Sequence, residues 1–251
     1  MSGNEFKLNH PPVVEAIIDF DCEMPLDYSL ADLRTDADKA FLAEYPERLQ
    51  IFSDEFSVRG YSHAPPELDA SRVLSSFRYI SIDKLTVVQV RPIGFSFNRL
   101  APYRSLDDYL PEIQRAWHVF AEFAKPLSLT EIKLRYINLI RVPEQFGKVS
   151  LNDYFKFVPQ DIEDQSIRLD KFLVHKVGSE QTTANLVKVT LTDQPMEQNF
   201  LPIILDIETS AKTSLEPGNW EGIRRRLGDL RSLKNKVFEG ELKPKCISLF
   251  Q

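Results

Sequence analysis

The feature that most constrains the fold is a strict alternation of apolar and polar side chains along several extended segments. In residues 11–25, PPVVEAIIDFDCEMP, the side chains of Ala16, Ile18 and Phe20 fall on one side of an extended chain, and carboxylates fall on the other. Side chains repeat with a period of two along a β-strand, so this pattern is typical of a strand with one buried face. It predicts a sheet that covers a core on one side and carries charge on the other.

The same alternation runs through residues 131–141, EIKLRYINLIR, and residues 203–210, IILDIETS. The charged side chains that share one parity are basic in the first segment and acidic in the second: Lys133, Arg135 and Arg141, then Asp206 and Glu208. If the strands are neighbours, Glu15 or Asp19 can pair with Arg135, and an exposed cross-strand pair contributes about 0.2–1 kcal/mol. Otherwise the charges form the solvated face of the sheet. The sequence leaves both interpretations open.

Three segments show the apolar spacing of amphipathic helices. A first helix covers residues 30–49, the clearest one begins at Ser105 and ends before Pro126, and a final helix lies between Asn219 and Gly240. The predicted strands come in runs with hairpin-length joins, which is typical of antiparallel sheet with helices on one face. We therefore predict an α+β fold with a largely antiparallel sheet and three main helices, in the approximate order βαβββαββββα.

The joins between the strands carry their own signals. Residues 63–70, HAPPELDA, predict a proline-rich connector, and residues 72–100 predict two strands, with Pro92–Gly94 interrupting the ladder of the second. A later hairpin is predicted to turn near Gly178.

The length of the chain, 251 residues, fits one large domain or two small ones. We predict a single α+β domain over residues 1–251, with a weak similarity in the order of elements between two halves at about 12–100 and 106–240.

Composition argues against several classes of protein. The net charge of −6 disfavours broad, charge-driven wrapping of nucleic acid. The two cysteines, Cys22 and Cys246, do not make a disulfide framework, which fits a reducing compartment. The first ten residues lack the apolar core of a signal peptide, and no apolar run approaches the roughly 18 residues of a membrane span. We expect a cytoplasmic protein without a membrane partner.

Three stretches together resemble a known family: PPVVEAIIDF (11–20), FSFNRLAPYRSLDDY (95–109) and LRYINLIRVP (134–143). The family is a sporadically distributed prokaryotic one of similar length, with no assigned biochemical function. The resemblance covers most of the chain and implies one domain, but it brings no catalytic residue with it. Its sporadic distribution implies an accessory role of the kind found in phage defence.

A polar groove is one interpretation of the charged strands. Its candidate lining residues come from separate predicted strands: Glu15, Arg99, Arg135, Tyr136 and Asn138. The planar fork of arginine suits a carboxylate or phosphate, and tyrosine and asparagine add oriented donors. This set predicts a site for a small ligand or a nucleotide. The alternative is that these residues belong to solvated sheet faces.

The last predicted helix is basic. Arg224, Arg225, Arg231 and Lys234 lie beside its apolar stripe. They are typical of the solvated face of an amphipathic helix, or they form a docking surface for an acidic partner or a nucleic-acid backbone. No aromatic residue is interleaved with this run, so a nucleic-acid role is possible but not favoured.

Metal and nucleophile signals are weak. Asp19, Asp206 and Glu208 offer the oxygen ligands that hard cations prefer, but no compact ligand loop holds them. The four histidines form no closely spaced pair, and the phosphate-loop, dinucleotide and G-x-S-x-G motifs are missing. We predict no cofactor and no metal.

Three functions follow from these observations. The first is a non-enzymatic binding or interaction protein with a protein partner or a second copy of itself. The second is a small-ligand sensor or enzyme that uses the polar groove. The third is a nucleic-acid-processing subunit that uses the basic helix.

Overall fold

The computed structural model describes residues 8–26, 28–31, 33–61, 64–144, 149–160, 166 and 169–251, with the backbone alone for residues 55–61 and 64–71. The strands are β1 (Val13–Glu23), β2 (Glu47–Tyr61), β3 (Ala64–Ile80), β4 (Thr86–Arg91), β5 (Gly94–Leu100), β6 (Ser128–Pro143), β7 (Leu173–Ser179), β8 (Leu186–Asp193) and β9 (Phe200–Leu215). The helices are α1 (Arg34–Phe41), α2 (Leu106–Ala124), α3 (Trp220–Glu241) and α4 (Pro244–Ile247), with 3₁₀ turns at Leu151–Asp153 and Ser248–Phe250.

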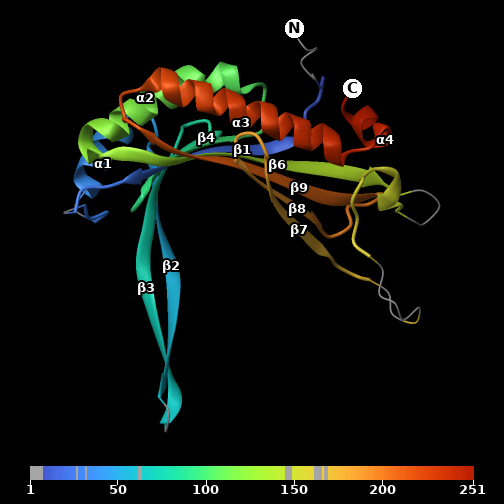
Figure 1. Cartoon of the computed structure of the whole chain (residues 1–251), viewed down its shortest axis with the longest axis horizontal. Helices are drawn as coiled ribbons and strands as arrows, with labels where there is room; N and C mark the ends of the chain where they lie inside the picture. Colours follow the sequence, from blue (N-terminus) through green and yellow to red (C-terminus); the bar gives the residue numbers. More distant parts are fainter. Residues whose placement is uncertain are drawn as a thin grey trace.

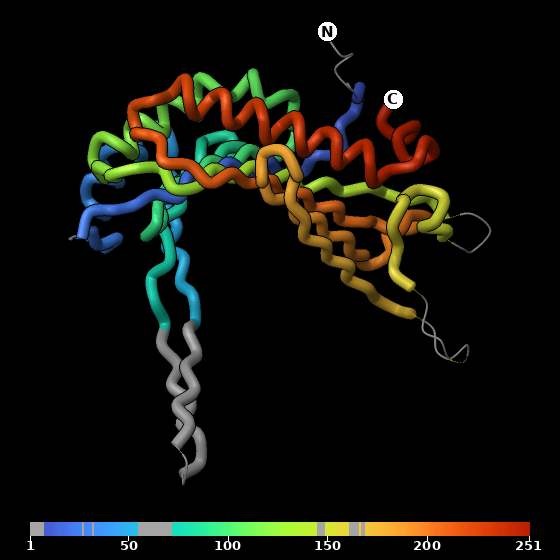
Figure 2. The backbone as a smooth tube through the Cα atoms, in the orientation of Figure 1, coloured from blue at the N-terminus to red at the C-terminus, as the bar shows by residue number. Residues whose placement is uncertain are grey.

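Over the described residues the strands form one antiparallel sheet in the order β2-β3-β4-β5-β1-β6-β9-β8-β7. Helices α1, α2 and α3 lie on one face of this sheet, and both of its ends bend away from them (Figure 1). The two ends of the described chain meet near α4, where the His10 N–H donates to the Phe250 carbonyl at 3.0 Å (Figure 2). We call the uncovered side of the sheet the open face.

The core lies between the central strands and the helices. Phe20 of β1 packs edge-on against Trp117 of α2 at 4.9 Å between ring centroids, and Phe95 of β5 packs on Phe120 at 5.4 Å. All four side chains are fully buried. Such a pair adds about 0.5–1.5 kcal/mol beyond the burial of its apolar area. The predicted α+β class and antiparallel sheet are therefore confirmed.

The predicted parity of β1 is also confirmed. Ala16, Ile18 and Phe20 are buried beneath the helices, whereas Glu15 and Asp19 are partly exposed on the open face. A one-residue slip would exchange these faces, so the apolar set fixes the register of the strand.

The order of elements differs from the prediction because residues 72–100 contain three strand segments instead of two. Pro92 and Ile93 turn the chain between β4 and β5 rather than interrupting one strand. Gly94 closes this turn with a φ of +142°, and a Cβ there would lie 2.0 Å from the Phe20 carbonyl oxygen. Only glycine fits where two strands approach each other this closely. The proline and glycine that predicted an interrupted strand are therefore part of a hairpin turn.

Other boundaries differ as well. Residues 64–70 of the predicted connector continue β3, because β2 pairs with them along its length. Helix α1 covers only Arg34–Phe41. The predicted turn at Gly178 lies within β7, where this residue pairs with Val187. Helix α4 is an addition to the three predicted main helices.

The strand order is similar on the two sides of the central β1–β6 pair. Going outward from β1 the strands are β5, β4, β3 and β2, and going outward from β6 they are β9, β8 and β7. In the first half, β1 pairs with β5, which is the last strand before the long helix α2. In the second half, β6 pairs with β9, which is the last strand before the long helix α3. These boundaries place α2 in the first half, unlike the predicted division at residues 100 and 106. A common origin of the halves and a single domain over residues 1–251 stay predictions.

None of the helices in the described ranges combines the length and the apolar character needed to cross a membrane.

Candidate functional site

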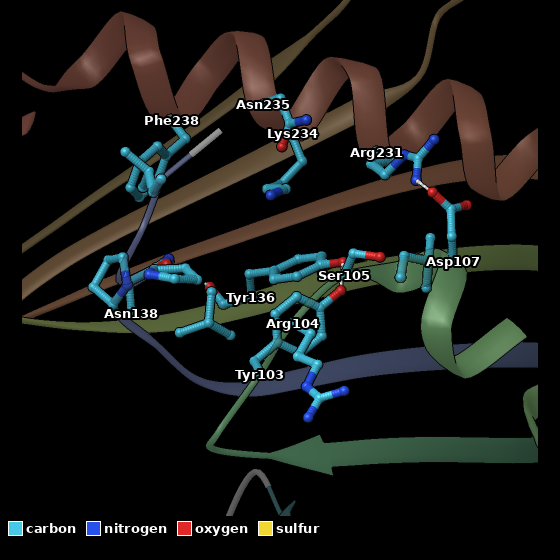
Figure 3. A pocket seen from close by; sticks show the side chains of 15 residues that line it. Tyr103, Arg104, Ser105, Asp107, Tyr136, Asn138, Arg231, Lys234, Asn235 and Phe238 are labelled. Atoms are coloured by element: carbon cyan, nitrogen blue, oxygen red, sulfur yellow. Dashed lines mark hydrogen bonds and ion pairs between the residues drawn. The ribbon is translucent and has the colours of Figure 1, made fainter. Parts of the chain in front are cut away.

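A pocket of about 320 Å³ lies between α3 and β6, closed at its sides by the segment before β1 and by the loop that enters α2 (Figure 3). We call it the α3 pocket. The segment before β1 contributes Leu8, Pro11 and Pro12, and β1 contributes its first residue, Val13. The loop contributes Tyr103, Arg104 and Ser105, and the first turn of α2 contributes Leu106 and Asp107. Strand β6 contributes Tyr136 and Asn138, and α3 contributes Arg231, Lys234, Asn235 and Phe238.

Local periodicity explains why these side chains meet. Arg231, Lys234 and Phe238 follow one another at three- and four-residue steps, which places them on one face of α3. Tyr136 and Asn138 are two residues apart, so both point to the helix side of β6. The pocket is therefore the place where one stripe of a helix crosses one face of a strand.

Two phenols and one amine form the centre of the pocket. The hydroxyls of Tyr103 and Tyr136 are hydrogen-bonded at 2.7 Å, and the Nζ of Lys234 lies 4.0 Å from the centroid of the Tyr136 ring. The Asn138 side-chain amide donates to the Leu205 carbonyl at 2.9 Å, which fixes its rotamer. These contacts hold the centre of the pocket in one arrangement.

The pocket carries an excess of positive charge. Arg231 forms an ion pair with Asp107 at 2.6 Å, whereas Lys234 and Arg104 form no ion pair with any residue the structure describes. Arg104 is exposed and its guanidinium points away from α3, so the cations of α3 in the pocket, Arg231 and Lys234, face a single carboxylate, that of Asp107 (Figure 3). The N-terminus of α2 begins beside them at Leu106, and its free backbone N–H groups add to the positive potential.

Burial changes the acidity of these groups. It lowers the pKa of Lys234 to about 8, with a further contribution from the positive charge of Arg231. It raises the pKa of Tyr136 to about 12, and it raises the pKa of Tyr103 with help from the neighbouring Tyr136. Both phenols are therefore protonated at neutral pH. Because one hydroxyl donates to the other, the accepting hydroxyl keeps its own proton for another partner.

The α3 pocket combines members of two predicted sites. Tyr136 and Asn138 come from the predicted polar groove, and Arg231 and Lys234 come from the predicted basic helix face. Tyr103, Arg104 and Ser105 are site residues that the charge and periodicity of the sequence do not predict. The signal that contains them is the segment LAPYRS (100–105), which belongs to the family resemblance.

The other residues of the basic helix point elsewhere. Arg224 is exposed and pairs with Glu221 at 3.0 Å on the same helix, and Arg225 is exposed. The four predicted cations therefore form two groups instead of one continuous basic surface.

The five residues of the predicted groove do not share one face, so that prediction is wrong in its geometry. Arg135 and Tyr136 are consecutive in β6 and point to opposite sides, as the pleat of a strand requires. Glu15 lies on the open face and accepts a hydrogen bond from Asn98 at 2.7 Å. Arg135 also lies there, but its guanidinium binds Asp206 in a bidentate manner, at 2.6 Å for the closest pair of atoms.

Arg99 is held on the helix side of the sheet. Its guanidinium donates to Thr86 Oγ1 at 2.8 Å and lies over the ring of Tyr109, 4.8 Å from the centroid. It therefore packs between β4, β5 and α2, apart from both Glu15 and Arg135.

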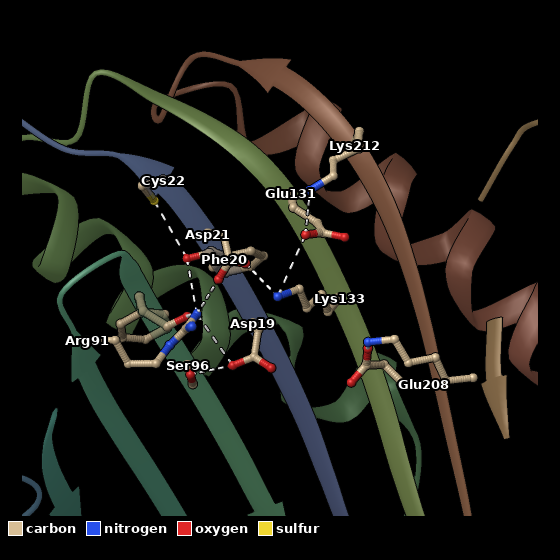
Figure 4. Close-up of polar contacts among 12 residues, drawn as sticks. Asp19, Phe20, Asp21, Cys22, Arg91, Ser96, Glu131, Lys133, Glu208 and Lys212 are labelled. Atoms are coloured by element: carbon tan, nitrogen blue, oxygen red, sulfur yellow. Dashed lines mark hydrogen bonds and ion pairs between the residues drawn. The ribbon is translucent and has the colours of Figure 1, made fainter. Parts of the chain in front are cut away.

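The open face is a ladder of cross-strand ion pairs (Figure 4). Asp21 of β1 binds Arg91 of β4 at 2.9 Å and Lys133 of β6 at 2.5 Å. Further along, Lys212 binds Glu131 at 2.9 Å. The acidic and basic strands are thus neighbours, and their charges neutralise one another.

The acidic residues of the weak metal alternative are engaged in these contacts. Asp19 accepts a hydrogen bond from Ser96, Asp206 binds Arg135, and Glu208 binds Lys188 at 2.7 Å. In the described part of the chain, no three histidine, cysteine or acidic side chains gather as they would around a metal ion. Asp19, Asp206 and Glu208 therefore do not form the proposed ligand set.

The sequence matches no family model and no curated protein. The family resemblance therefore stays a prediction. The three stretches that carry it all reach the α3 pocket, through Pro11 and Pro12, through Tyr103 and Arg104, and through Tyr136.

Proposed function

We propose that this chain is a binding protein for a small organic anion, and that the anion occupies the α3 pocket. The observation that carries the proposal is the position of Lys234, an ammonium group that lines the pocket without an ion-pair partner among the described residues. A desolvated charge is costly unless a partner compensates it. A bound carboxylate or phosphate supplies that partner.

The size and walls of the pocket support a small ligand. A volume of about 320 Å³ is at the lower end of the range found for small-molecule sites. Apolar walls from Pro11, Leu106 and Phe238 face polar groups from α3 and the loop. This mixture suits an anion with an organic body better than an inorganic ion.

We propose binding and not turnover, because the lining residues account for the charge and the apolar body of an anion without a step that breaks a bond in it. A role within a prokaryotic accessory system stays a prediction from the resemblance.

A nucleic-acid role has less support. Of the basic residues on α3, Arg224 pairs with Glu221 and Arg231 pairs with Asp107, so much of the charge is already neutralised. Salt-dependent binding of RNA or DNA would be the sign of this alternative.

The test is a thermal-shift screen of small carboxylates and phosphate esters against the full chain. A ligand at 100 times its Kd stabilises the folded state by about 2.7 kcal/mol. We expect Lys234→Met to abolish the shift and Lys236→Met, at an exposed position of the same helix, to retain it. An anion whose shift survives Lys234→Met would contradict the proposal.

A further inference from the structure

We propose that Lys234 captures its ligand covalently, by condensing its ε-amino group with the carbonyl carbon of a small 2-oxo acid. The inference rests on the proposed anion-binding function and names the class of anion. It describes reversible capture and requires no turnover.

The first support is the placement of the amine. Lys234 points from α3 into the pocket, and its nitrogen lies over the Tyr136 ring at 4.0 Å from the centroid (Figure 3). Among the described residues, no carboxylate or carbonyl accepts a hydrogen bond from it. Once deprotonated, the amine therefore has its lone pair available to a molecule in the pocket.

The second support is the electrostatic setting of this amine. The groups that face it are the Tyr136 ring from β6, the Tyr103 hydroxyl from the loop, and Arg231 from its own helix, whose partner is Asp107 of α2. Burial and Arg231 hold the pKa of Lys234 at about 8. About a quarter of the amine is then neutral at pH 7.5, against roughly one part in a thousand for an ordinary lysine.

The third support is the positive charge of Arg231, which lies on the same face of α3 as the amine. Arg231 lies three residues before Lys234, and side chains at this spacing are neighbours on a helix. In a 2-oxo acid the carboxylate is bonded directly to the carbonyl carbon. The carboxylate therefore enters the pocket together with the carbonyl carbon, and the positive charge of Arg231, whose guanidinium lies on the Asp107 side of Lys234, attracts it (Figure 3).

The chemistry balances without an oxidant or a reductant. The neutral amine adds to the carbonyl carbon, a C–N bond forms, and the carbonyl oxygen becomes a hydroxyl. Loss of this hydroxyl with a proton from nitrogen releases one water and leaves the imine. Of the Tyr103 and Tyr136 hydroxyls, the one that accepts the hydrogen bond between them can donate its own proton to the departing oxygen.

The experiment traps the imine with glyoxylate and sodium cyanoborohydride at pH 7.5 and locates the modified lysine by peptide mass spectrometry. We expect Lys234 to be modified at least about tenfold faster than the exposed Lys236. Excess oxalate, which carries carboxylates but no reactive carbonyl, should slow modification of Lys234 alone. Similar rates at the two lysines, without protection by oxalate, would overturn the inference.

A second variant separates this inference from the proposed function. Lys234→Arg keeps a cation in the pocket but cannot form an imine, and its melting temperature checks that it folds. Oxalate binding is measured independently by thermal shift, in the wild type and in this variant. If oxalate stabilises both proteins but Lys234 is not trapped preferentially, covalent capture is wrong and anion binding stands. If oxalate and the other carboxylates stabilise neither protein, the proposed function fails as well.

Discussion

Single side chains in the α3 pocket depend on one another because the pocket is partly closed to water. The Tyr103 and Tyr136 hydroxyls satisfy each other at 2.7 Å, and Lys234 packs on the Tyr136 ring. A buried hydroxyl without a partner costs about 1–3 kcal/mol. The two phenols therefore act as a unit, and removing one affects the other.

We predict that Tyr103→Phe lowers the free energy of unfolding by about 1–3 kcal/mol, because the buried Tyr136 hydroxyl loses its partner. The double variant Tyr103→Phe, Tyr136→Phe should lose less than the sum of the single variants, since it leaves neither hydroxyl unpaired. Urea denaturation of all four proteins measures the cycle. Strict additivity would show that the two hydroxyls are not coupled.

Arg135 lies on the open face, outside the pocket, so we predict that replacing it does not affect anion binding. Its side chain is 40% exposed and pairs with Asp206, and such a pair contributes about 1 kcal/mol or less. Arg135→Ala should therefore lower stability only slightly and leave the anion-induced thermal shift unchanged. Loss of that shift in a variant with a normal melting temperature would show that Arg135 takes part in anion binding.

The hairpin between β4 and β5 depends on one residue of its turn. Gly94 has a positive φ, and a Cβ there would lie 2.0 Å from the Phe20 carbonyl oxygen of β1. We predict that Gly94→Ala lowers the free energy of unfolding by at least about 3 kcal/mol, from backbone strain and from displacement of β1.

Gly178→Ala is the matched control for this substitution. Gly178 also lies in a strand, but nothing would lie within 4 Å of the added Cβ. Chemical denaturation of the two variants should show a large loss for Gly94→Ala and little change for Gly178→Ala. Equal effects would mean that the close approach of β5 to β1 is not what requires glycine.

At the scale of single elements, sequence periodicity predicted the features that local spacing determines, which are the buried faces of strands and the extent of a long helix. The faces of β1, β6 and β9 and the length of α2 follow from apolar positions two or three to four residues apart. The β4–β5 turn was misread because a proline and a glycine in a strand indicate an irregularity without saying whether the chain reverses. That depends on the Phe20 backbone, more than 70 residues away in sequence.

The site was harder to predict because it depends on which elements are neighbours. The alternation of β6 separates Arg135 from Tyr136, and this was visible in the sequence, but grouping residues by polarity combined them in one groove. That Tyr136 meets Lys234, nearly 100 residues later, follows from α3 packing across β6. No local pattern specifies this crossing, so only two of the five predicted groove residues and two of the four predicted basic residues line the pocket.

Across the whole molecule, the sheet order places β1 and β6 at the centre and β2 and β7 at the edges. Backbone amides of central strands exchange with solvent only when large parts of the fold unfold, whereas those of edge strands exchange after local unfolding. We predict that hydrogen exchange is slowest in β1 and β6 and fastest, among the strands, in β7. Exchange by mass spectrometry measures this order, and protection of β7 equal to that of β1 would indicate that another chain pairs with that edge.

The ionisation of Lys234 tests the central claim most directly, and heteronuclear NMR can follow it, with Lys234→Arg to assign the resonance. We predict a pKa of about 8 in the free protein and a higher pKa when an organic anion is bound, because the anion stabilises the ammonium form. By linkage, anion affinity then falls as the pH rises through 8. A Lys234 pKa near the ordinary value of about 10.4, unchanged by any anion, would contradict the account.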